Sequence, residues 1–157
     1  MIVGSVSGTY TDAVLWVFSS TIAGKAWLAT AALALAVVQV STGARIFGKL
    51  QRVIPIGRPY VNRIHRWSGR LAVLLTLPVA FHCIFILGFQ TSNARVLAHS
   101  LIGSFFYGAF AVKVFAVRER SLPGWVLPVA GGTLFSVLAA LWATSSFWYF
   151  TNVRFGF

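Results

Sequence analysis

The chain has 157 residues, of which 58% are hydrophobic and only 10% charged, and its mean hydropathy is +0.82. A soluble domain carries about a quarter charged residues, so this composition excludes an ordinary soluble globule and predicts one integral membrane domain over residues 1–157. Lys and Arg number 13 against two acids. Because these basic residues fall between long apolar runs, they indicate orientation in a bilayer rather than nucleic-acid binding.

The apolar stretches predict an all-α fold, an integral membrane four-helix bundle. The first run, Ala13 to Ile22, is short, and we expect it to form an interfacial helix that Gly24 and Lys25 separate from the first span; a broken, longer first helix is the alternative. A bilayer core about 30 Å thick needs roughly 20 helical residues. Four later stretches meet that length, at about 26–43, 71–89, 96–117 and 125–150.

Basic residues are concentrated on one side of this arrangement. The side that holds the connections between spans one and two and between spans three and four carries Arg45, Lys49, Arg52, Arg58, Arg63, Arg66, Arg70, Lys113, Arg118 and Arg120. The other side carries Lys25, Arg95 and Arg154. The positive-inside rule then predicts a bacterial plasma-membrane protein with cytoplasmic basic loops and both termini outside.

The connections themselves carry further predictions. The long basic loop, Phe47 to Ile64, contains Pro55 and Pro59, and we expect it to be ordered but not helical. The loop between spans two and three, Gln90 to Arg95, is short, so these two helices are predicted to be antiparallel neighbours.

Two histidines lie inside the predicted spans, where an ionisable residue indicates function by default. His82 lies seven residues, about 10 Å, inside the outer end of span two, and His99 lies about 6 Å inside the outer start of span three. Because the helices are antiparallel, both imidazoles are expected at similar depth in the outer half of the membrane. That placement suits two axial ligands on opposite faces of one haem iron, hence one haem b.

Neighbouring residues favour the same interpretation. Arg95, one turn outward from His99, is placed to meet a haem propionate. Gly103, one turn inward, would let a flat macrocycle approach the helix, and Tyr107 adds aromatic bulk. Pro78, four residues before His82, should kink span two.

Alternatives remain open for these histidines. Each could form only an interhelical hydrogen bond. A zinc site needs three or four ligands, and no third Cys, His or acid is expected at that depth, an objection that also holds for copper.

His65 is predicted to be a solvated or headgroup-level histidine at the cytoplasmic boundary. The alternative, a ligand to a second haem, requires partners about 14 residues from the other two histidines. Those positions are Ser68 and Lys113, which do not ordinarily ligate haem, and His65 is about 100° off the face of His82. The spacing therefore predicts one haem.

Two short motifs resemble known families. The run His65-Arg66-Trp67-Ser68-Gly69-Arg70-Leu71-Ala72 followed by His82, and the run Arg95 to Gly103, are similar to ligand helices of cytochrome b-561-like and ferric reductase-like transmembrane proteins. This resemblance covers roughly Arg63 to Val117. Those families carry two haems on four histidines, whereas this chain offers one complete pair. The overall pattern also looks like a small bacterial four-helix family that the resemblance associates with Rieske-type iron–sulfur partners.

Together these features predict a membrane electron carrier of a respiratory type. Its single haem would lie between membrane quinol, or an external donor, and a periplasmic redox protein. No flavin- or nicotinamide-binding motif is present. The second hypothesis is a haem-free structural anchor or assembly subunit of a larger membrane complex. A small transporter is a third, which lacks the membrane-embedded acids that transport normally needs.

Overall fold

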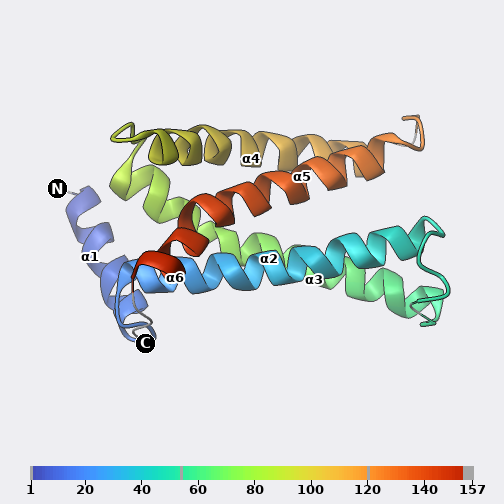
Figure 1. The fold of residues 1–157 in the computed structure, drawn as a ribbon, viewed down its shortest axis with the longest axis horizontal. Coiled ribbons are helices and arrows are strands. Elements are labelled where there is room, and N and C mark those ends of the chain that lie inside the picture. Colours follow the sequence, from blue (N-terminus) through green and yellow to red (C-terminus); the bar gives the residue numbers. More distant parts are fainter. Residues whose placement is uncertain (1, 54, 120, 154–157) are drawn as a thin grey trace.

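The computed structural model describes residues 2–53, 55–119 and 121–153, and all of the regular secondary structure in these segments is helical (Figure 1). The elements are α1 (Ile2–Leu15), α2 (Thr21–Ile46), α3 (Arg58–Phe81), η1 (His82–Leu87), α4 (Ala94–Arg118), α5 (Val126–Trp142), η2 (Ala143–Phe147) and α6 (Trp148–Asn152). Four continuous helices are long and apolar enough to cross a membrane, over 21–46, 58–87, 94–118 and 126–152. The prediction of a four-helix membrane bundle is confirmed, and the chain is a multi-pass membrane protein.

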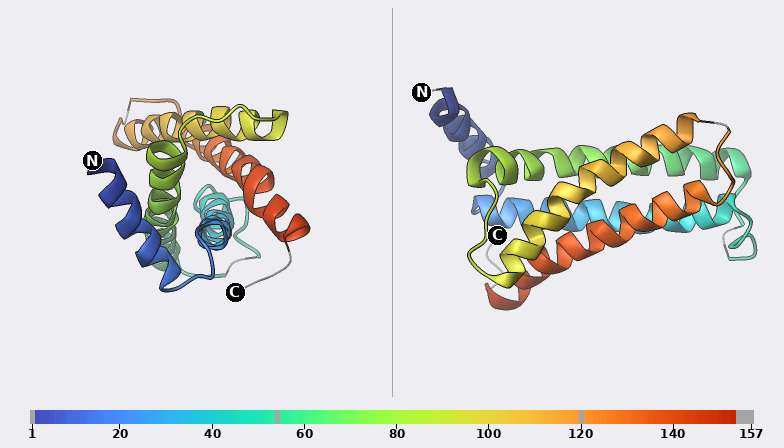
Figure 2. Two further views of the ribbon diagram at one scale, coloured as in Figure 1. Left: turned by 90° about the vertical axis from the view of Figure 1, so that its left-hand side faces the viewer. Right: turned by 90° about the horizontal axis from the view of Figure 1, so that it is seen from above.

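α2 is the central helix of the bundle. It packs against α3 along most of its length and against α5, while α4 packs against α5 (Figure 2). Its buried positions are small residues, namely Ala23, Gly24, Ala26, Ala32, Ala36 and Thr42. Small side chains let neighbouring helix backbones approach closely, which is the usual basis of helix association in a membrane. The composition of α2 therefore explains its position between two partners.

α3 and α4 are antiparallel, as predicted, but they do not form a closely packed pair. Few of their backbone positions lie close together, and the two helices diverge. The hydroxyl of Tyr107 on α4 bridges the gap by donating a hydrogen bond to Thr76 of α3, at 3.2 Å to Oγ1. The space between these two helices is where the cavity described below lies.

The N-terminal helix is present, but the prediction of its position was wrong. α1 ends at Leu15, and the expected separator residues Gly24 and Lys25 lie inside α2. α2 starts early because the Ser20 hydroxyl caps it, accepting a hydrogen bond from the Ala23 amide. Gly24 is then needed at the α1–α2 contact, since a Cβ there would lie 2.8 Å from Val14.

The predicted non-helical loop over Phe47 to Ile64 was wrong in its second half, because α3 begins at Arg58. Pro59 occupies the first turn of the helix, where a missing backbone N–H costs nothing. Compared with the predicted start at about residue 71, the extension adds about three and a half turns to α3 and places His65 within the helix instead of before it.

Two of the spans change to π-helix at the same end of the bundle. α3 contains Pro78 and continues from Phe81 into η1, and α5 continues into η2. η1 ends at Gly88, whose φ of 69° favours glycine. Single π-helical turns are frequently found at functional sites. α1, α6 and the α3–α4 connection all lie at this end (Figure 1), while the α2–α3 and α4–α5 connections lie at the other. We call these the histidine end and the basic end.

Candidate functional site

A cavity of about 640 Å³ occupies the histidine end of the bundle. Such a volume is within the range of small-molecule and cofactor sites, roughly 300–1,000 Å³. All four spans contribute to its wall. Among the lining residues are Lys25, Ala29, Thr76, Cys83, Arg95, His99, Gly103, Tyr107, Leu138 and Thr144. Most of the wall is apolar, so the few polar side chains determine what the cavity can bind.

His99 lies in this wall with its orientation fixed by Thr144 of η2. The Nδ1 atom of His99 is 2.9 Å from the Thr144 hydroxyl, and that hydroxyl donates its own hydrogen to the Ala140 carbonyl at 2.8 Å. Because the threonine hydrogen is committed, the hydroxyl oxygen accepts from the Nδ1–H of the imidazole. The neutral tautomer that results has its lone pair on Nε2. This is the arrangement that a second-shell partner gives to a metal-ligating histidine.

Arg95 is held by the same threonine. Its Nη1 atom donates to the Thr144 carbonyl at 2.6 Å, and its guanidinium lies 4.3 Å from the centre of the Trp148 ring. The carbonyl belongs to η2, where the wider π-helical turn alters the regular hydrogen-bond ladder. A guanidinium has five N–H donors, so most of them remain available to a ligand in the cavity.

Lys25 provides a second cation in the wall, from α2. The only two acids of the chain, Asp12 and Glu119, are not among the lining residues. A cavity with two cations and a mostly apolar wall favours an amphipathic, anionic ligand.

His82 is buried, but it is not among the residues that line the cavity. Only 7% of its surface is exposed, its Nδ1 atom has no hydrogen-bond partner, and its ring lies 5.2 Å from the ring of Tyr10 on α1. The Tyr10 hydroxyl donates to the Pro78 carbonyl at 3.2 Å. Burial, with a smaller effect of nearby Cys83, raises the pKa of the Tyr10 phenol and keeps it a donor at neutral pH. The residue next to His82, Cys83, does line the cavity.

Gly103 and Tyr107 both line the cavity, as the predicted haem site requires of them. A Cβ at Gly103 would lie 3.7 Å from Leu141, an ordinary contact, so the protein itself does not demand glycine there. Tyr107 and Thr76 are the most inward lining residues of α4 and α3, and a hydrogen bond joins them.

His65 lies at the basic end, half-buried on α3 against α2. Its Nδ1 atom is 2.9 Å from the hydroxyl of Thr42 on α2. Gln39 extends this α2–α3 contact by donating to the His65 carbonyl and, at 2.9 Å, to the Ser68 hydroxyl. The helical start at Arg58 is what turns His65 towards α2.

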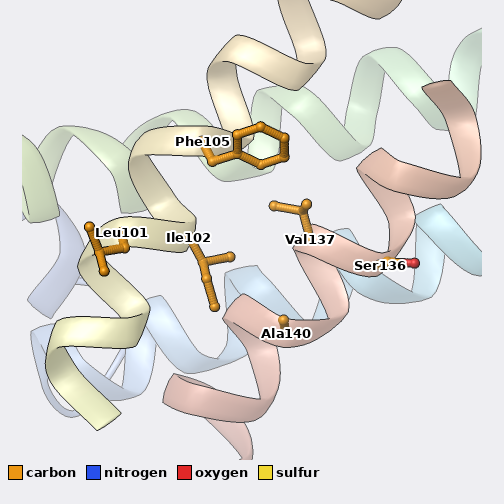
Figure 3. Close-up of a pocket in the computed structure, with 6 residues that line it drawn as sticks. All are labelled: Leu101, Ile102, Phe105, Ser136, Val137 and Ala140. Atoms are coloured by element: carbon orange, nitrogen blue, oxygen red, sulfur yellow. The ribbon is translucent and has the colours of Figure 1, made fainter. Parts of the chain in front are cut away.

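A second hollow, of about 380 Å³, lies on the outer side of the α4–α5 pair. Its lining is apolar except for the hydroxyl of Ser136 (Figure 3), and it consists of Leu101, Ile102, Phe105, Ser136, Val137 and Ala140. Apart from that hydroxyl it presents no polar side chain to a ligand. Within the described residues, no group of three or more His, Cys, Asp or Glu side chains could hold a metal ion.

Among the cavity residues that sequence reasoning missed, Thr144 and Lys25 carry the polar groups discussed above. Thr144 opens a run of three hydroxyl residues, Thr144 to Ser146, inside an otherwise apolar helix, and that run was the available signal. Lys25 was assigned to a connection between helices because the start of α2 was placed five residues too late.

The fold and the cavity define a class: a multi-pass helical membrane protein with a cavity between its spans whose wall includes two cationic side chains. Within that class, the chain belongs to DUF6529, a family of unknown function, whose match covers residues 2–157. No curated protein and no solved structure matches the chain.

Proposed function

We propose that the protein is a membrane electron carrier that holds one haem b in the cavity at the histidine end. It would pass electrons between quinol, or an external donor, and a periplasmic redox protein. The observation that carries the proposal is the orientation of His99. Thr144 holds its Nδ1 atom, so the Nε2 lone pair remains for an iron atom.

The charges of the wall support a haem over a neutral ligand. Haem carries two propionates on one edge of an apolar macrocycle, and the cavity offers Arg95 and Lys25 within a mostly apolar lining. Charge-assisted hydrogen bonds to carboxylates are about twice as strong as neutral ones. A neutral isoprenoid quinone would leave both cations without a counter-charge in a low-dielectric wall, which is costly.

His82 is our assignment for the second axial ligand, which requires its ring to turn from Tyr10 on α1 towards the cavity that it does not line. Its buried Nδ1 atom without a partner leaves a nitrogen to offer, and leaving it unpaired costs about 1–3 kcal/mol. The rival is Cys83, one residue further along, which lines the cavity directly. The two assignments predict different spectra, because thiolate and imidazole ligands tune haem iron differently.

The residues of the chain then have distinct tasks. When bound, haem supplies one-electron oxidation and reduction. Thr144 fixes the ring of His99, Arg95 and Lys25 neutralise the ligand's carboxylates, and the apolar wall limits access of water. Because the cavity lies at one end of a core about 30 Å thick, donor and acceptor must both approach from that end or from within the adjacent leaflet. A Rieske-type iron–sulfur protein, suggested by the family resemblance, would be such an acceptor or donor.

The test is the visible spectrum of detergent-purified protein from haem-replete cells. We expect a Soret band and a six-coordinate low-spin spectrum, lost in H82A and retained in the matched variant C83S. An unchanged six-coordinate spectrum in H82A would overturn the His82 assignment, and a changed spectrum in C83S would transfer the position to the thiolate. Colourless, haem-free wild-type protein would overturn the carrier proposal and favour a structural anchor within a larger membrane complex.

A further inference from the structure

Three arginines form a stripe on α3 at the basic end. Arg63, Arg66 and Arg70 follow one another at spacings of three and four residues, which places them within about 60° of each other around the helix. We call these three residues the arginine stripe. It extends over about 10 Å of the helix axis.

The stripe faces away from the bundle. The face of α3 that packs on α2 is marked by the buried residues Val61, Ser68 and Ala72. At about 100° per residue, the stripe lies roughly opposite that face, and all three arginines are exposed. In a membrane, this side of α3 is covered by lipid.

Among the residues that the structure describes, no carboxylate pairs with the guanidinium groups of the stripe. Asp12 and Glu119 are the only acids of the chain, and Glu119 accepts its hydrogen bonds from Ser121. These hydrogen bonds lower the pKa of the Glu119 carboxyl. Within the described segments, the only cation–π contact of the stripe places the Arg70 guanidinium over the Trp67 ring, 5.2 Å from the ring centre.

The same face of α3 continues into the membrane as an apolar surface. Leu74 and Leu77, one and two turns beyond Arg70, are 58% and 48% exposed and lie on the side of the stripe. Trp67, 55% exposed, lies between Arg66 and Arg70 along the helix, and tryptophan is enriched at membrane interfaces. A cationic segment followed by an apolar one along a single helix face matches a phospholipid with an anionic headgroup.

We propose that the arginine stripe and the adjoining Leu74–Leu77 surface form a binding site for an anionic phospholipid of the leaflet around the basic end. The phosphodiester would bind the guanidinium groups, which suit phosphate geometry better than ammonium groups do, and an acyl chain would lie along the leucines. This proposal is independent of haem, because the site lies on the opposite end and the outer surface of the bundle.

The experiment is native mass spectrometry of the full chain in detergent, titrated with phosphatidylglycerol or with phosphatidylcholine of the same acyl chains. We expect preferential retention of phosphatidylglycerol. Each basic residue near an anionic lipid surface contributes roughly a fivefold gain, so R63Q/R66Q/R70Q should lower the apparent affinity by about 100-fold. The lysine variant R63K/R66K/R70K should fall between this variant and the wild type.

The matched control is K49Q/R52Q/R118Q, which removes three exposed charges from the same end without touching the stripe. Its affinity for phosphatidylglycerol should stay within about threefold of the wild type, because the site retains its contacts. An equal loss in both triple variants would overturn the site in favour of a diffuse surface potential. Equal binding of the two lipids, or displacement of phosphatidylglycerol by inorganic phosphate alone, would also overturn it.

Discussion

The two ends of the bundle contain the same small motif in different surroundings. At the histidine end, Nδ1 of His99 is 2.9 Å from the Thr144 hydroxyl; at the basic end, Nδ1 of His65 is 2.9 Å from the Thr42 hydroxyl. Both threonines donate their own hydrogen to a carbonyl four residues earlier, at 2.8 and 2.6 Å. Both imidazoles therefore have the same tautomer, with the lone pair on Nε2.

What differs is the space around each ring. His99 lines a cavity with two cations in its wall, whereas His65 is absent from that lining and belongs to the hydrogen-bonded α2–α3 contact with Gln39. A histidine held by a threonine is thus not by itself a ligand site. The cavity is what favours a ligand at His99 and a helix-packing role at His65.

The largest expected difference between the two ends is in haem binding by alanine variants. H99A should contain no haem, because it removes the nitrogen that the cavity presents, while H65A should retain the wild-type Soret band and stoichiometry. Absorbance at the Soret maximum per mole of purified chain measures both. Loss of haem from H65A with unchanged helix content would contradict the distinction between the ends.

Removing the threonine hydroxyls that hold the two histidines should also affect haem binding at the histidine end only, and by less than H99A does. T144V should weaken haem binding by about 10- to 100-fold, as loss of a second-shell partner does for metal sites, and T144S should restore it. T42V should leave haem affinity unchanged and lower the free energy of unfolding by about 0.6 kcal/mol, the usual value of an interhelical hydrogen bond in a membrane. Haem transfer to apomyoglobin and denaturant titration provide the two readouts. Equal haem loss in T42V would count against the account.

The smallest expected effect concerns the cations. Lys25 in the cavity wall favours the reduced haem, which carries one positive charge fewer, so K25Q should lower the midpoint potential by roughly 50 mV, equivalent to about 1 kcal/mol of Coulomb interaction. K113Q, which removes a lysine on the basic side of the bundle, should shift the potential several times less. Spectroelectrochemical titration measures both, and an increase in potential in K25Q would contradict a propionate-side position for Lys25.

The membrane architecture could be predicted from sequence because it depends on length and apolarity alone. The starts of the helices were harder to predict. α2 begins after the Ser20 cap in a Ser-rich segment, and α3 has Pro59, which we expected to exclude a helix, in its first turn. Both errors made the predicted helices too short, so the surroundings of Lys25 and His65 could not be predicted.

The site could be predicted in part. His99, Arg95, Gly103 and Tyr107 share one helix face by simple spacing, and all four line the cavity. Thr144 could not be assigned, because its contact with His99 joins residues 45 positions apart in the chain. The orientation of His82 depends on α1 and on the π-helical turn that starts at this residue, neither of which the spacing of histidines indicates.

The most direct test of the account is the haem content of the wild-type protein, measured by the pyridine haemochrome method against chain concentration after detergent purification from haem-replete cells. The account predicts one haem b per chain. A chain without haem would contradict the carrier function, and two haems per chain would contradict the distinction between the His99 and His65 ends.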